Sequence, residues 1–264
     1  MEPPVVVHGI SRHGIPITIF GEIHNQVIQS FYEELDMKGK SLWVEHSTVF
    51  CSLQKEEHAL FEKAKGGEWV WFTQHLQGKP VRCVDIRIEL GLLSSIEEHR
   101  MRMVIEQMGE SDEMVHQVVA YVIKVTMKTV STITSLKKML APIMSDLKPI
   151  LSNLRIRMDS ILQKVQVRAF TNKNVQALYE ESVEVHDDIV RLGSITLDAY
   201  LMHLFNDHDE KKPIYLFAGM NHAFRLAHWL GWTIEPYDSL VKRSIQLSAL
   251  EPLESAKTIV KEIK

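Results

Sequence analysis

Residues 15–26 read IPITIFGEIHNQ, a short apolar run that ends in a glycine, a glutamate and a histidine. The β-branched residues of the run predict a buried strand. Glu22 and His24 are two residues apart, so an extended backbone points both side chains to one side, while Ile23 points into the packing. Gly21 allows the backbone to turn tightly or to come close to a ligand. This strand end therefore predicts one part of a polar site.

Similar apolar runs recur along the chain and predict the fold class. We expect buried strands at residues 5–10, 17–22, 42–47, 81–86 and 214–219. The first two are joined by a stretch containing SRHG, residues 11–14, which favours a hairpin, whereas helical patterns separate the later ones. This alternation predicts an α/β protein with a mostly parallel central sheet and flanking helices.

A long helical segment interrupts this pattern. Between about residue 95 and residue 208 helical periodicity replaces the strand pattern, and we expect breaks at Pro142, at Pro149 and at residues 171–174. The predicted organisation is an α/β frame at 1–94 and 212–264 with a helical insertion at 95–211.

One apolar stripe in the insertion has two readings. Its residues are Met114, Val118, Tyr121, Val122 and Val125. Apolar side chains at helical spacing favour core packing. An oligomer formed through this helical region is the alternative.

Composition narrows the function classes. The chain has 264 residues, and 45% of them are hydrophobic, which is enough for a sizeable core. Its net charge of −4 does not favour a nucleic-acid partner.

The N-terminus lacks the pattern of a signal peptide, and no apolar run approaches the roughly 18 residues of a membrane span. The two cysteines, Cys51 and Cys83, lack CxxC spacing and suit a reducing compartment. A cytoplasmic location is the expectation.

Polar residues also close three of the other predicted strands. Glu45 and His46 end the third strand, Asp85 and Arg87 the fourth, and GMNH at 219–222 follows the fifth. The last motif repeats the glycine-to-histidine spacing of GEIH at a second junction between a strand and a helix. Because open α/β sheets bind ligands at the carboxyl ends of parallel strands, we expect these residues to share one site.

The residue types allow two chemistries. Glu22, His24, Glu45 and His222 suit a divalent ion such as zinc, manganese or cobalt, with an unligated carboxylate acting as base toward bound water. Without a metal, a histidine would activate water while a glutamate holds its tautomer. Each of these residues also has a purely structural interpretation. Glu22 would then interact with the dipole of the following helix, and Asp85 and Arg87 would form an ion pair that only neutralises both charges.

The chain resembles the superfamily that groups TraB/PrgY and GumN proteins, Tiki metalloproteases, erythromycin esterases and ChaN haem-binding lipoproteins. The resemblance is carried by GEIH, by the glutamate of WVEHS and by IYLFAGMNHAFRLAHWLGWTIEPY, within residues 15–90 and 212–238. GEIHN is closer to the esterase and ChaN form than to the Tiki form. The resemblance implies a hydrolase that cleaves an ester or peptide bond in a small-molecule or peptide substrate.

One departure from the family pattern favours a second reading. Leu197 stands where Tiki and TraB members usually carry an arginine. Either Arg87 or Arg191 substitutes for it, which makes Arg87 a candidate catalytic residue, or the activity is altered or lost. The alternative function is a non-catalytic binding or structural protein that keeps this fold, such as an assembly component or a binder of a haem-type ligand.

Overall fold

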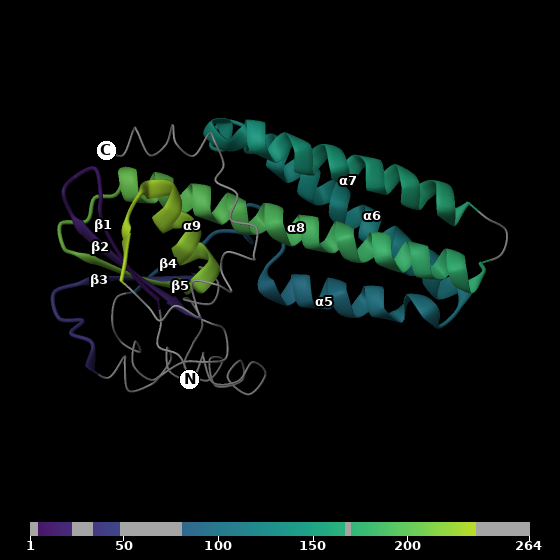
Figure 1. The fold of residues 1–264 in the computed structure, drawn as a ribbon, viewed down its shortest axis with the longest axis horizontal. Coiled ribbons are helices and arrows are strands. Elements are labelled where there is room, and N and C mark those ends of the chain that lie inside the picture. The colour runs from purple at the N-terminus through teal and green to yellow at the C-terminus, as the bar shows by residue number, and fades with distance from the viewer. Residues whose placement is uncertain (1–4, 23–33, 48–80, 167–169, 236–264) are drawn as a thin grey trace. The chain divides into compact units, whose positions relative to one another are not determined.

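The structure is a computed structural model, and the residues it describes are 5–22, 34–47, 81–166 and 170–235 (Figure 1). The chain divides into two compact units. The sheet unit combines residues 1–86 and 200–264, and the helical unit consists of residues 87–199.

A six-stranded sheet is the centre of the first unit. Its strands are β1 Val5–Ile10, β2 Pro16–Glu22, β3 Ser41–Ser47, β4 Val81–Asp85, β5 Ile214–Gly219 and β6 Thr233–Ile234, in the order β4-β3-β5-β2-β1-β6. The five strands predicted from the apolar runs are all present. The short β6 was not among the predicted strands and follows the Gly231-Trp232 pair.

The sheet is mixed, which corrects the prediction of a mostly parallel sheet. β2, β3, β4 and β5 pair in parallel, but β1 runs antiparallel to both β2 and β6. The cause is the tight connection at residues 11–14, where the amide of Gly14 donates to the carbonyl of Ser11 at 3.0 Å. A connection this short can join only antiparallel neighbours, because a parallel pair needs a crossover of a dozen or more residues.

The two faces of the sheet bury different side chains. One face carries an apolar cluster of buried residues, which are Val6, Phe20, Leu42, Val44 and Phe217. Alternation places Val7, Ile19, Trp43 and Leu216 on the other face, and all four are fully buried. Helix α9, Met220–Leu230, follows β5 directly and ends at Gly231 in the left-handed conformation that glycine adopts at low cost.

Gly21 packs closely against α9. A Cβ atom built on Gly21 would lie 2.6 Å from the Cβ of Ala223 and 3.1 Å from the Cα of Met220. The structure therefore gives this glycine a packing role, in which the absence of a side chain lets α9 lie against β2. The predicted approach of Gly21 to a ligand stays a prediction.

The helical unit contains four long helices that lie alongside one another (Figure 1). They are α5 Ser95–Glu106, α6 Asp112–Ser135, α7 Met144–Val165 and α8 Asn172–Asn206, and the last residues of α8 belong to the sheet unit. Ion pairs of Arg157 with Glu184 and of Lys164 with Glu181 join α7 to α8. His186 of α8 contacts the backbone carbonyl of Glu98 in α5 at 3.0 Å.

Two of the three predicted helix breaks are observed. The chain makes a 3-10 turn at Ala141–Ile143, which contains Pro142, and α8 begins at Asn172. The predicted break at Pro149 is wrong, because this proline lies inside α7. Burial of Leu147 and Ile150 on either side of it favours a continuous helix over the lost backbone hydrogen bond.

The apolar stripe of α6 is part of the core of the helical unit. Val118 and Val122 are fully buried within the chain, and Val125 is nearly so. This confirms core packing for these residues and leaves oligomerisation through the helical region as an untested alternative.

Cys83 corrects the expectation drawn from the cysteines. This residue of β4 is disulfide-bonded, and the other cysteine of the chain, Cys51, lies outside the described residues. A disulfide is typical of oxidising compartments, so the cysteines no longer favour a cytoplasmic location, which stays a prediction. Within the described part of the chain, no helix combines the length and the apolar character needed to cross a membrane.

Candidate functional site

Glu45 lies where β3 leaves its regular pairing with β4. The register of these two strands shifts between Val44 and Ser47, and Glu45 and His46 fall within that irregularity. On its other side, β3 pairs regularly with β5 as far as Val44 and Phe217. A local change of this kind re-aims the side chains that follow it. It thus positions Glu45 at the junction of β5 with α9.

Both carboxylate oxygens of Glu45 contact this junction. The amide of Gly219, the N-cap residue of α9, donates to Oε2 of Glu45 at 2.6 Å. Oε1 lies 3.1 Å from Nε2 of His222, a residue in the first turn of the helix. The side chains are 10% and 9% exposed, so water screens their interaction only weakly. The partial positive charge at the N-terminus of α9 adds to the stabilisation of the carboxylate.

Arg225 defines the hydrogen-bonding roles of the imidazole. Its Nη2 lies 3.3 Å from Nδ1 of His222, one helical turn away. A guanidinium group has no acceptor atom, so Arg225 donates and Nδ1 accepts. In the neutral ring the proton therefore lies on Nε2, which donates to Glu45. This arrangement makes Nδ1 the basic nitrogen of His222.

Glu22 lies on the strand next to this pair. β2 and β5 run in parallel, and their register places Glu22 opposite Gly219. Glu22 is 8% exposed. The two glycine-to-histidine motifs therefore start side by side on neighbouring parallel strands, as their positions in the sequence suggest. His24, the histidine of the first motif, lies outside the described residues.

The other predicted site residues fall in two places. Asp85 is the last residue of β4, is buried, and lies opposite Ser47 of β3. Arg87 belongs to the helical unit, where its Nη1 lies 3.3 Å from Oε1 of Glu98. Arg191 belongs to the same helical unit.

The metal-binding reading gains no support from the described residues. Among them, no three histidine, cysteine, aspartate or glutamate side chains are grouped so as to hold an ion. His222 has a partner on each ring nitrogen, and Glu45 uses one oxygen on His222 and the other on Gly219. These contacts are those of a hydrogen-bonded carboxylate–imidazole pair.

Arg225 is the residue that the motif analysis misses. It lies three residues after His222 on α9, a spacing that places two side chains on the same face of a helix. This spacing could have identified it once the helix was predicted from AFRLAHWLGW. Arg225 supplies a guanidinium group next to the candidate histidine.

Comparison of the chain with models of protein families, with characterised proteins and with solved structures finds no match. The resemblance to the superfamily of TraB, Tiki and erythromycin esterase proteins stays a prediction carried by the motifs.

Proposed function

We propose that this protein is a hydrolase of ester or peptide bonds, with its site where β2, β3 and β5 end at the N-terminus of α9. The observation that supports the proposal best is the buried pair of Glu45 and His222, with 3.1 Å between Oε1 and Nε2. A carboxylate that accepts the proton of one imidazole nitrogen holds the ring in place and raises the basicity of the other nitrogen.

Each side chain has a distinct part in the proposed reaction. Nδ1 of His222 takes a proton from the water that attacks the carbonyl carbon, and Glu45 stabilises the positively charged imidazole that results. The imidazole then gives this proton to the leaving alkoxide or amine as the ester or peptide bond breaks. Arg225, whose guanidinium group lies beside Nδ1, turns from the ring to the substrate and stabilises the negative charge that develops on the carbonyl oxygen. Glu22, on the neighbouring strand, is the nearby carboxylate that helps to orient the substrate or the water.

The test compares variants of the pair with a control on the same helix. We expect His222→Ala to reduce the hydrolysis of a panel of p-nitrophenyl esters and short peptides by about 100-fold or more. Glu45→Gln, which keeps the shape but removes the charge, should reduce it by about 10- to 100-fold. The control is His228→Ala, because His228 is an exposed histidine in the last turn of α9. If His228→Ala is as impaired as His222→Ala, the assigned roles are wrong.

The metal dependence predicted from the sequence needs a separate measurement. Metal content of the purified protein is compared with that of the double variant His24→Ala and His222→Ala. A divalent ion that is present in the wild type and lost in the double variant would favour the metal-dependent form of the hydrolase. Equal metal content in the two would remove both histidines from the ligand shell.

The second candidate function is a non-catalytic binding or structural protein. The observation that favours it is that Glu45 and His222 use all of their side-chain hydrogen-bonding atoms on each other, on Gly219 and on Arg225. Such a cluster would join β3, β5 and α9 without any turnover. In that case the wild type cleaves none of the panel, and Glu45→Gln and His222→Ala lower the free energy of unfolding by similar amounts.

A further inference from the structure

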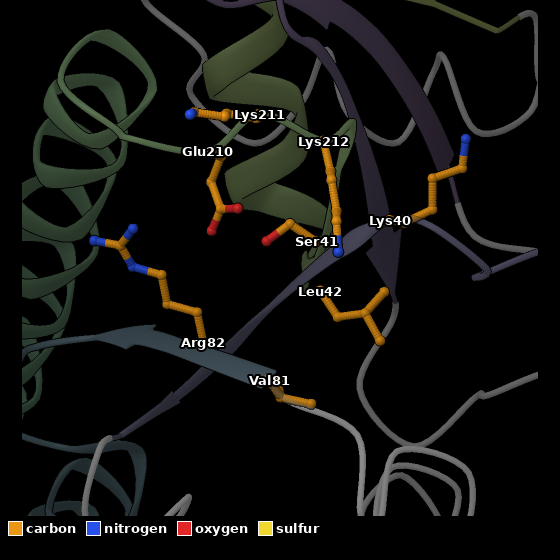
Figure 2. A pocket seen from close by; sticks show the side chains of 8 residues that line it. All are labelled: Lys40, Ser41, Leu42, Val81, Arg82, Glu210, Lys211 and Lys212. Carbon is orange, nitrogen blue, oxygen red and sulfur yellow. The ribbon is translucent and has the colours of Figure 1, made fainter.

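A basic pocket opens at the amino ends of β3 and β4, in the sheet unit. It has a volume of about 380 Å³ and is lined by Lys40, Ser41, Leu42, Val81, Arg82, Glu210, Lys211 and Lys212 (Figure 2). This volume lies in the range of small-molecule sites. Ser41 and Val81 are the first residues of β3 and β4, whereas Glu45 lies near the opposite end of β3. The pocket is therefore separate from the candidate hydrolase site.

The charge of the pocket is opposite in sign to that of the chain. Four of its side chains are positive and one, Glu210, is negative, in a chain with a net charge of −4. Oε1 of Glu210 already accepts the indole N–H of Trp43 at 3.4 Å. Within the described part of the chain, none of the four positive side chains forms an ion pair. Their mutual repulsion favours an anion in the pocket.

Arg82 is the pocket cation that packs on the ring of Trp43. Its guanidinium carbon lies 4.8 Å from the centroid of the Trp43 ring, and Trp43 is fully buried. This cation–π contact restrains the guanidinium group, so less conformational entropy is lost when it binds a ligand. Figure 2 shows that Lys40 and Lys211 extend away from the centre of the pocket, whereas Ser41 and Lys212 point toward it.

We propose that this pocket binds the phosphate group of a small molecule. A guanidinium group matches two phosphate oxygens at once, and the ammonium of Lys212 and the hydroxyl of Ser41 add donors to the remaining oxygens. A compact pocket with a few cations suits one phosphate group, whereas a nucleic-acid strand needs a long basic groove with aromatic platforms.

The binding test uses inorganic phosphate and glycerol 3-phosphate in isothermal titration calorimetry at constant ionic strength, with glycerol as the uncharged control. We expect Arg82→Gln and Lys212→Gln each to weaken phosphate binding by about tenfold or more, because each removes a charged hydrogen bond. Tighter binding of glycerol 3-phosphate would indicate an organic phosphate as the ligand. Tighter binding of inorganic phosphate would indicate the free ion.

Matched controls separate a site from general charge effects. Arg12→Gln and Lys38→Gln remove the same charges from exposed positions of the sheet unit that do not line the pocket. They should change the affinity by less than about twofold, since exposed charges are strongly screened. An equal loss in the controls and in the pocket variants would overturn the proposal, and so would the absence of phosphate binding in the wild type. Lys212 is exposed, so its variant keeps the test valid even if Arg82→Gln fails to fold.

His208 provides an independent readout of occupancy. Its ring packs edge-on against Trp43, at 6.0 Å between centroids. Burial lowers the pKa of His208, the positive charges of His13 and Arg82 lower it further, and Glu210 and Asp209 act in the opposite direction. A phosphate bound at Arg82 would offset part of that positive charge. In NMR titrations of the wild type, phosphate should therefore raise the pKa of His208. In Arg82→Gln, phosphate should leave this pKa unchanged. The proposal is contradicted if phosphate does not change the pKa of His208 in the wild type.

Discussion

Replacing Gly21 with alanine tests the contact that holds α9 against the sheet. The new Cβ atom would lie 2.6 Å from Cβ of Ala223, where ordinary contacts exceed 3.4 Å, and 3.1 Å from Cα of Met220. Gly21 lies inside β2 and has no positive φ, so alanine can adopt its backbone conformation and the cost comes from packing alone. Because part of the clash is with the helix backbone, rotation of a side chain cannot relieve it. We expect a loss of about 1–3 kcal/mol in the free energy of unfolding, the range for overpacked cores.

A double-mutant cycle with Ala223→Gly makes this prediction specific. Ala223→Gly alone should lower the free energy of unfolding by about 1 kcal/mol, because glycine is a poor helix former. In the double variant, the methyl group of residue 21 fits into the space left by that of residue 223. The double variant should therefore be more stable than the sum of the two single changes predicts, by about 0.5–2 kcal/mol.

Urea unfolding followed by circular dichroism measures all four proteins. The reasoning is refuted if Gly21→Ala is as stable as the wild type, or if the two changes are additive. Because α9 carries His222, the displaced helix should also weaken the contact of His222 with Glu45. The change in the imidazole environment would be visible by NMR in Gly21→Ala and reversed in the double variant.

Three further predictions concern separate parts of the chain. Burial lowers the pKa of His208, so this side chain binds a proton at higher pH in the unfolded chain than in the folded one. The free energy of unfolding should therefore fall as the pH is lowered below about 6.5, the pKa of an unperturbed histidine. The slope is at most about 1.4 kcal/mol per pH unit. His208→Phe should make urea unfolding less dependent on pH between 5 and 7, and an unchanged dependence contradicts this. Ser94→Ala removes the capping box that Ser94 forms with Glu97 at the start of α5, and should cost about 1 kcal/mol in urea unfolding, against no loss if the cap is unimportant. Gly9→Ala would place a Cβ atom 1.9 Å from the ring of Trp232. We expect the free energy of unfolding to fall by about 1–3 kcal/mol. A loss below about 0.5 kcal/mol would show that the ring moves aside freely.

The candidate site could be predicted from the sequence only in part. Apolar runs that end in Glu22, Glu45 and Gly219 identified the strand ends, because the alternation of buried residues is a local property of the chain. The contact between Glu45 and His222 could not be derived in the same way. It depends on β3 pairing with β5, on the irregular register after Val44, and on the helix that starts at Gly219.

Several expectations changed because packing outweighed a local preference. Pro149 has a strong tendency to end a helix, yet α7 continues through it because its neighbours are buried. The packing of Gly21 against Ala223 joins a strand to a helix that lies far away in the sequence. Cys83 shows no disulfide spacing in the sequence, because a disulfide depends on distance in space and not along the chain.

The sequence by itself determined the strands, the hairpin at 11–14, the long helical segment and the residue types at the strand ends. These follow from the period of the apolar residues and from turn chemistry, both of which act over a few residues. Only the tertiary structure decided that the sheet is mixed, that Glu45 accepts a hydrogen bond from His222, and that Arg82 and Lys212 share one pocket. Each of these brings together residues far apart in the chain, and their pairing is decided by the burial and geometry of the whole sheet.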